Sequence, residues 1–220
     1  RSGLARERTH MDGNYPYHHK DIITSGGSGF GLMAILVGIE RGFITREEAL
    51  ERYEKVMEFL EHADRFHGVF PHWWDGPSGR VHPFSKNDDG GDLVETAFLF
   101  QGLLTVREYF RNGSEREKAL ADRIDASRRK VEWDWHTREG EDVLYWHWSP
   151  DKGWEMDMKI KGYNECLIVY ILAASSPTHP DRRPSGAGAG TPCSLLSPWF
   201  ASAAAGFAAR LGGVRPLAPV

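Results

Sequence analysis

The amino-acid sequence predicts an all-α fold, and three features support this prediction. Several long stretches repeat their apolar residues at helical spacing. Two of these stretches begin with a complete helix-capping signature, and the segments between helices contain only short alternating runs that suit hairpins. The chain has 220 residues, of which 40% are hydrophobic and 26% charged, so it is long enough for one core domain and a tail.

The first two helices are expected between Ser25 and Asp64, where the helical period ends. Ser25-Gly-Gly-Ser-Gly-Phe-Gly31 leads into an almost wholly apolar run, and such a helix must be buried on most sides. Thr45-Arg-Glu-Glu48 forms a capping box, which places the start of the second helix there. Its predicted buried stripe is Leu50, Tyr53, Val56, Met57 and Leu60.

The middle of the chain alternates between loops and helices. Aromatic segments on both sides of Asp75-Gly-Pro-Ser-Gly79 indicate a hairpin or a long loop. The remaining elements are expected to be a helix from Asp92 to Phe110, a helix from the capping box Ser114-Glu-Arg-Glu117 to about Trp133, a short strand over Val143–Ser149 and a helix over Tyr163–Ala174. Helical hairpins of this kind pack into bundles, solenoids or toroids.

Composition excludes several classes of function. A net charge of −4 and a pI near 6.2 provide no basic field, so we expect no nucleic-acid partner. Two cysteines, Cys166 and Cys193, cannot form a disulfide framework. No apolar run reaches the roughly 18 residues of a membrane span, and no signal peptide is predicted in this chain. Localisation stays open.

Acidic residues gather around two glycines in Ser85-Lys-Asn-Asp-Asp-Gly-Gly-Asp-Leu-Val-Glu95. Asp92 and Glu95 share a helix face, and Asp88 approaches the same helix end from the loop. Closely spaced carboxylates separate their pKa values, which is what the acid and base of glycosidic bond cleavage require. The alternative is that Asp92 only caps its helix. Glu165, at the start of another helix, is a further candidate with the same alternative.

Aromatic residues in polar segments suggest sugar binding. Trp and Tyr combine apolar area with a polar group, which suits stacking against sugar rings. The alternative is that they fill the core beneath long loops. The candidate substrate-binding residues are His72, Trp73, Trp146, Trp148 and Glu155.

No cofactor and no metal are predicted. The glycine-rich segment at Ser25 lacks the spacing of a nucleotide-binding loop, and tight packing or the wall of a pocket is the better interpretation. Ten histidines include no zinc-binding motif. Calcium is an option only at the clustered carboxylates Asp88, Asp89 and Asp92.

Several motifs together resemble the bacterial glucoamylase-like domain family. The resemblance rests on Ser2-Gly-Leu-Ala-Arg-Glu-Arg8, Thr24-Ser-Gly-Gly-Ser-Gly-Phe-Gly31, Arg41-Gly-Phe-Ile-Thr-Arg-Glu-Glu48, Gly90-Gly-Asp-Leu-Val-Glu-Thr96, Trp146-His-Trp-Ser-Pro150 and Gly162-Tyr-Asn-Glu-Cys166. It implies an (α/α)6 toroid of the six-hairpin glycosidase type and a glucan substrate. Characterised relatives in that family include endo-β-1,2-glucanases and transglycosylating domains of cyclic β-1,2-glucan synthases.

The resemblance also implies site residues and a reaction. Asp88, Asp92 and Glu95 would form one rim of an acidic pocket and Glu165 another. The implied reaction is inverting acid/base hydrolysis of a glucan, with β-1,2-glucan favoured. A non-catalytic carbohydrate-binding or scaffold protein and a transglycosylase module are the alternatives.

The family pattern covers residues 1–180 and is absent from residues 181–220. We expect the first part to be the N-terminal half of the toroid, with about half of its hairpins. The tail is expected to be disordered or to result from a frameshift. Under one choice of synonymous codons, another reading frame from Asp181 onward encodes Pro-Ala-Ala-Val-Trp-Arg-Gly-Gly-Trp. An open half-barrel would expose apolar helix faces. We therefore predict self-association through that edge and little activity from this chain alone.

Overall fold

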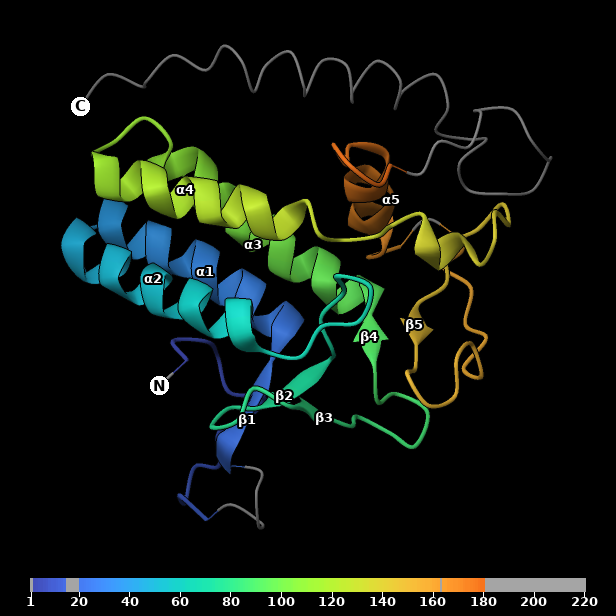
Figure 1. Cartoon of the computed structure of the whole chain (residues 1–220). Helices are drawn as coiled ribbons and strands as arrows, with labels where there is room; N and C mark the ends of the chain where they lie inside the picture. The colour runs from blue at the N-terminus through green and yellow to red at the C-terminus, as the bar shows by residue number, and fades with distance from the viewer. Residues whose placement is uncertain (1, 15–19, 163, 181–220) are drawn as a thin grey trace.

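The computed structural model describes residues 2–14, 20–162 and 164–180 and confirms a mostly helical fold (Figure 1). Within these residues the helices are α1 (Ser25–Glu40), α2 (Arg46–His62), α3 (Leu93–Phe110), α4 (Glu115–Arg128) and α5 (Leu167–Ala174), with a short 3₁₀ helix, η2, at Trp135–Thr137. None of these helices is long and apolar enough to cross a lipid bilayer. Residues 181–220 and Tyr163 lie outside the described ranges, so the expectations for them stay expectations.

The strands are short and belong to two small antiparallel sheets. β1 (Ile22–Thr24), β2 (Trp73–Asp75) and β3 (Val81–His82) form one sheet in that order. β4 (Gly91–Asp92) pairs with β5 (His147–Trp148), with Asp92 opposite His147. The strand expected over Val143–Ser149 is therefore shorter than predicted, because only two of its residues find a ladder partner on β4.

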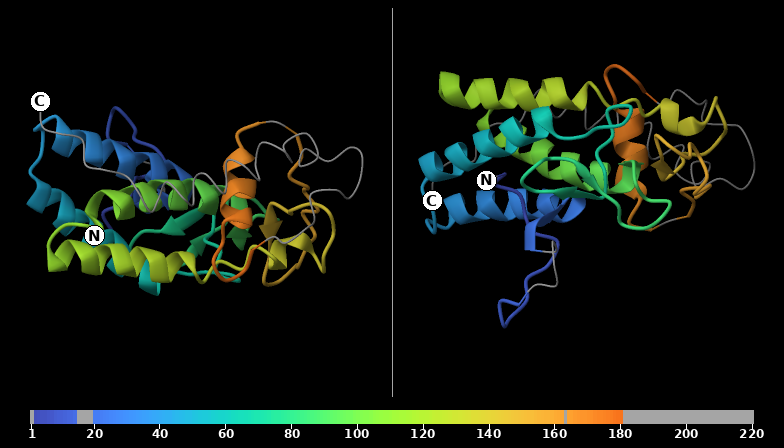
Figure 2. Two further views of the ribbon diagram at one scale, coloured as in Figure 1. Left: turned by 90° about the horizontal axis from the view of Figure 1, so that it is seen from above. Right: turned by 60° about the horizontal axis from the view of Figure 1, so that its bottom comes forward.

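The strands and long loops gather at one end of the helices (Figure 2). β1 leads directly into α1 and β4 directly into α3, so the N-termini of both helices lie at this end. The loops that carry the candidate site residues therefore converge there.

Helices α1 and α3 pack backbone against backbone through glycine. A Cβ on Gly29 would lie 2.6 Å from the Phe98 carbonyl carbon and 2.8 Å from Leu99 Cα. The same atom on Gly102 would lie 2.8 Å from Gly29 Cα. The tight-packing interpretation of the glycine-rich run is thus confirmed.

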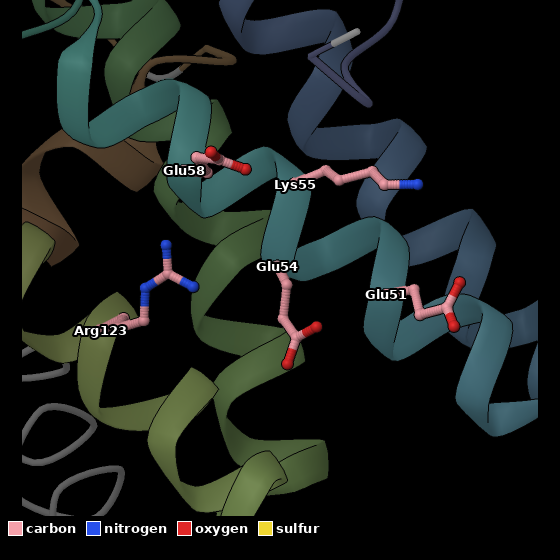
Figure 3. Close-up of a pocket in the computed structure, with 5 residues that line it drawn as sticks. All are labelled: Glu51, Glu54, Lys55, Glu58 and Arg123. Carbon is pink, nitrogen blue, oxygen red and sulfur yellow. The ribbon is translucent and has the colours of Figure 1, made fainter.

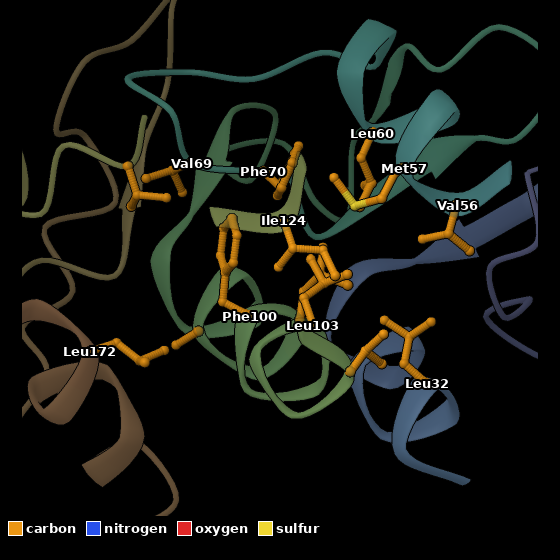
Figure 4. Packing of buried hydrophobic residues seen from close by; sticks show 14 of the residues in the cluster. Leu32, Val56, Met57, Leu60, Val69, Phe70, Phe100, Leu103, Ile124 and Leu172 are labelled. Atoms are coloured by element: carbon orange, nitrogen blue, oxygen red, sulfur yellow. The ribbon is translucent and has the colours of Figure 1, made fainter. Parts of the chain in front are cut away.

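The core joins all five helices and the loops at their ends (Figure 4). The five residues predicted as the stripe of α2 are all buried: Leu50, Tyr53, Val56, Met57 and Leu60. Trp74 of β2 is also fully buried, so this indole is a core residue.

One stripe of α1 is exposed, although most of this helix was expected to be buried. Gly27, Phe30, Ala34 and Val37 recur at helical spacing along it and are all solvent-exposed. Phe30 is 54% and Val37 56% exposed. The buried side of α1 faces α3, and among the described residues no element covers the opposite side.

Both predicted capping boxes are present. The Thr45 and Ser114 side chains accept from the amides of Glu48 and Glu117, and those glutamates accept from the cap amides in return. α4 ends at Arg128, earlier than the predicted Trp133. Beyond it the chain turns, and the Val131 and Trp133 side chains enter the core from a loop.

Candidate active site

Asp92 lies at the junction of β4 and α3, where it is fully buried. One carboxylate oxygen accepts the amide of Glu95 at 2.9 Å and so caps α3. The other accepts from Trp146 Nε1 at 3.0 Å. The capping role considered from the sequence is therefore confirmed. Capping uses only one of the two carboxylate oxygens of Asp92.

His72 connects Asp92 to Asp88. Its Nδ1 lies 3.2 Å from Asp92 Oδ2 and 3.5 Å from Asp88 Oδ2. Burial opposes protonation of this imidazole, but the two facing carboxylates of Asp88 and Asp92 outweigh burial and raise the pKa of His72 to about 10.

A second imidazole approaches Asp88 from the other side. His147 Nε2 lies 3.5 Å from Asp88 Oδ1 and accepts the Gly90 amide at 3.0 Å. His147 is almost completely buried, and burial lowers its pKa despite the nearby carboxylates. Asp88 is thus held between two imidazoles of different character.

Glu95 is the more accessible carboxyl of this group. It is half-buried in the first turn of α3, and its Oε2 accepts the Gly26 amide at 3.0 Å. Burial, and then the charge of Asp92, raise the pKa of Glu95. A carboxyl with a raised pKa beside a buried capping carboxylate has the character of a general acid.

Glu165 is exposed, directly ahead of Cys166, where α5 begins. Burial raises the pKa of the Cys166 thiol to about 11, with further contributions from the charges of Glu165 and Asp92. The Asp92 and Glu165 carboxylates therefore both act on the same buried thiol.

The predicted aromatic residues separate into two groups. Trp73 lies beside His72 and Phe84, whose rings are stacked at 4.2 Å. Trp146 donates to Asp92. These two indoles belong to the acidic site.

The contacts of Trp148 and Glu155 lead to residues outside the acidic cluster. Trp148 packs edge-on against His67 at 4.8 Å and against Trp135 at 6.1 Å. Glu155 is exposed, and its charge acts on Lys152, the ion-pair partner of Asp89. Asp89 is therefore paired with a cation.

Nitrogen and oxygen donors in this cluster could hold a divalent cation. One donor atom each from His72, Asp88 and Asp92 lies within 4.8 Å of the others. A metal-bound histidine must be neutral, however, and the proton favoured on His72 competes with any ion.

His147, Gly26 and Phe84 were not predicted as site residues. His147 was visible as the middle residue of Trp146-His-Trp148. No sequence signal pointed to the Gly26 amide, because its role depends on how α1 meets α3.

A charged hollow lies elsewhere, between α2 and α4 (Figure 3). It is lined by Glu51, Glu54, Lys55, Glu58 and Arg123. None of these residues belongs to the acidic cluster, and the hollow lacks the aromatic surface that a sugar site requires.

Several known proteins are similar to this chain in sequence and in structure. The chain is 50% identical over 180 residues to an exo β-1,2-glucooligosaccharide sophorohydrolase (non-reducing end) of Parabacteroides distasonis, matching 81% of this chain and 24% of that protein. Among solved structures, it is 62% identical, with a TM-score of 0.81, to a protein of Bacteroides caccae named a "putative glucoamylase", covering 84% of this chain and 44% of that one.

It is also 61% identical, with a TM-score of 0.80, to an endo-β-1,2-glucanase of Chitinophaga pinensis solved with sophorotriose and glucose, covering 84% of this chain and 43% of that one. The homologues of this chain are glucoamylase-like glycoside hydrolases. The predicted resemblance and partial helical toroid are confirmed by these matches. No family model matches the chain, which spans about a quarter of the curated relative and less than half of the solved chains.

Proposed function

We propose that this chain forms one side of the active site of a β-1,2-glucan hydrolase. The observation that carries the proposal is the meeting of Asp88, Asp92, Glu95 and His72 at the N-terminus of α3. Trp73 and Trp146 lie beside them, where indole surfaces suit sugar rings. The glucan-hydrolysing homologues support the substrate class.

The proposed reaction is inverting hydrolysis. One carboxylic acid donates its proton to the glycosidic oxygen as the bond to the anomeric carbon breaks. A carboxylate on the opposite side takes a proton from water, whose oxygen forms the new bond to that carbon. Glu95 is the candidate acid on the α3 side because its pKa is raised. Glu165 supplies the opposite carboxyl.

The test measures reducing ends released from β-1,2-glucan over long incubations at high protein concentration, because little activity is expected from this chain alone, with an α-glucan as the substrate control. Glu95→Gln and Glu165→Gln should each lower kcat by roughly 100- to 10,000-fold. The matched control is Glu58→Gln, which changes an exposed carboxyl on α2 and should leave turnover unchanged. Full turnover in both site variants would refute the assignment.

The same assay separates the alternatives. A carbohydrate-binding or scaffold protein would bind β-1,2-linked glucose oligomers in calorimetry without releasing reducing ends. A transglycosylase would produce longer or cyclic glucans.

We also propose that residues 1–180 are the N-terminal half of the toroid and that the exposed stripe of α1 associates with another apolar surface. Phe30 and Val37 leave more than half of their area open, and burying such surface is worth about 25 cal/mol per Å². Val37→Asp should reduce self-association of the chain, measured by analytical ultracentrifugation. Equal sedimentation of both forms would contradict the proposal.

A further inference from the structure

We propose that the indole of Trp135 is the centre of an outer sugar-binding surface, over which a glucan chain extends beyond the acidic cluster. This Trp135 surface comprises the rings of Trp135, Trp148, Trp154 and His67. Trp148 was expected to bind substrate, and the surface gives it that role outside the acidic cluster. The identity of the glucan rests on the proposed function, whereas the surface itself is a property of the fold.

Trp135 presents an open indole to solvent. It is 40% exposed, more than any other tryptophan among the described residues. The tryptophans that fill the core, Trp74 and Trp133, are buried instead. The His67 ring lies parallel to the Trp135 ring, with centroids 3.8 Å apart and an interplanar angle of 9°. The imidazole therefore supports one face of an indole that still meets solvent.

Several contacts hold the Trp135 surface in place. His67 Nδ1 lies 2.9 Å from Glu132 Oε2, and the His67 carbonyl accepts from the Glu132 amide at 3.0 Å. Trp148 packs edge-on against His67 at 4.8 Å and against Trp135 at 6.1 Å. The Trp154 ring lies 6.2 Å from that of Trp135. Side chains that are already ordered lose little conformational entropy when a ligand binds.

Backbone strain is concentrated around this surface. Among the described residues, the non-glycine positions with a left-handed backbone are His67, Arg138, Glu139 and Asp157, with φ between 46° and 66°. Arg138 directly follows η2, which carries Trp135, and it pairs with Asp157 at 2.6 Å. Such angles persist only where surrounding contacts fix them, and they cluster at binding sites. The strain therefore favours a binding role over simple packing.

The chemistry of the Trp135 surface suits a neutral ligand with many hydroxyl groups. Indoles offer apolar area for the C–H faces of sugar rings. Glu132 and Asp134 precede Trp135 in the chain and are partly exposed, and ionised carboxylates accept hydrogen bonds from hydroxyl groups. Asp134 also lies 3.3 Å from His179 Nδ1. The carboxylates disfavour an anionic ligand, and a wholly apolar partner would bury them away from water, so a sugar fits best.

The Trp135 surface adjoins the acidic cluster through β5. In the β4–β5 ladder, His147 pairs with Asp92 and Trp148 pairs with Gly91. His147 Nε2 lies 3.5 Å from Asp88 Oδ1, whereas Trp148 contacts His67 and Trp135. Consecutive residues of one strand thus belong to the two sites, and a polymer bound at the acidic cluster can continue over Trp148 onto Trp135.

The first test measures binding of polymeric β-1,2-glucan to the full chain by isothermal titration calorimetry. Trp135→Ala should weaken binding by about 2- to 10-fold, the size of one aromatic contact. Trp135→Phe keeps a ring on His67 and should restore part of the affinity. The matched control is Phe43→Ala, which removes an 81% exposed ring between α1 and α2 and should bind like the wild type.

Three results would overturn the proposal: no binding by the wild type, equal affinity in Trp135→Ala, or a loss in Trp135→Ala that Trp135→Phe does not partly restore. The last result would assign the effect to disturbed packing. Because calorimetry requires no turnover, Trp135-dependent binding without released reducing ends would support the Trp135 surface and contradict the proposed function alone.

The second test compares kinetic constants on substrates of different length. Trp135→Ala should raise KM for polymeric β-1,2-glucan by about 2- to 10-fold. It should change kcat far less, because a contact outside the acidic cluster holds the ground state and the transition state equally. The short substrate sophorotriose should show a smaller change in KM than the polymer. A fall in kcat with KM unchanged would refute an outer binding role for Trp135.

Discussion

The glycine contact between α1 and α3 gives the most direct test of how the sequence sets the fold. Replacing Gly29 by Ala would put Cβ 2.6 Å from the Phe98 carbonyl carbon and 2.8 Å from Leu99 Cα. Side-chain Cβ atoms essentially never approach within 3.0 Å of a heavy atom outside their own residue and its two chain neighbours. Because the obstructing atoms are backbone, no side chain can rotate away, and the helices must separate.

The expected cost is that of an overpacked core, about 1–3 kcal/mol, reduced by the roughly 1 kcal/mol that Ala gains over Gly in a helix. Gly31 is the matched control. It lies two residues along the same helix, and a Cβ there would meet no atom within 4 Å. Gly31→Ala should therefore raise the free energy of unfolding by up to about 1 kcal/mol.

The assay is urea unfolding followed by circular dichroism, with both variants compared at equal m-value. Gly29→Ala should have a lower midpoint than the wild type and Gly31→Ala an equal or higher one. Two variants of equal stability would show that the α1–α3 distance is not limited by glycine.

Further predictions concern pH and helix capping. The pKa of His72 is raised from 6.5 to about 10. The contribution of this imidazole to stability is therefore complete below pH 6.5 and is lost as pH rises toward 10. In a calorimetric pH series, His72→Gln should make the thermal stability less dependent on pH over that range. His136 shows the opposite sign, because burial lowers its pKa from 6.5 to about 4. Its contribution is present above pH 6.5 and is lost as pH falls toward 4, so His136→Phe should weaken the acid-side decline in the same series. Thr45→Ala and Ser114→Ala each remove a capping side chain and should lower the free energy of unfolding by about 1 kcal/mol in urea titrations; an unchanged midpoint would show that the cap is not formed in solution.

Local signals in the sequence predicted the helices well because each helix has its own signature. Thr45 and Ser114 cap the helices that they were expected to cap, and the five-residue stripe of α2 is buried. The end of α4 was placed too late, because Val131 and Trp133 are apolar residues of a loop that enters the core. Periodicity does not distinguish such residues from another helical turn.

The candidate site was only partly accessible from the sequence. The carboxylates of Asp88, Asp92 and Glu95 were visible because they lie within one short segment. The imidazoles that face these carboxylates come from distant segments: His72 from the residue before β2, and His147 from β5. Only the pairing of β4 with β5 brings His147 opposite Asp92, and neither composition nor spacing specifies that pairing.

The fold and the site depend on the same helix start. Ser25 holds the His72 carbonyl, and the next amide along α1, that of Gly26, binds Glu95 of α3 at 3.0 Å. Any change that moves α1 away from α3 therefore stretches the hydrogen bond to Glu95 and moves the anchor of His72 at the same time. Because that bond favours the ionised form of Glu95, its loss would raise the pKa of Glu95 further. A packing change at Gly29 should thus alter the acid–base balance of a site that it does not touch.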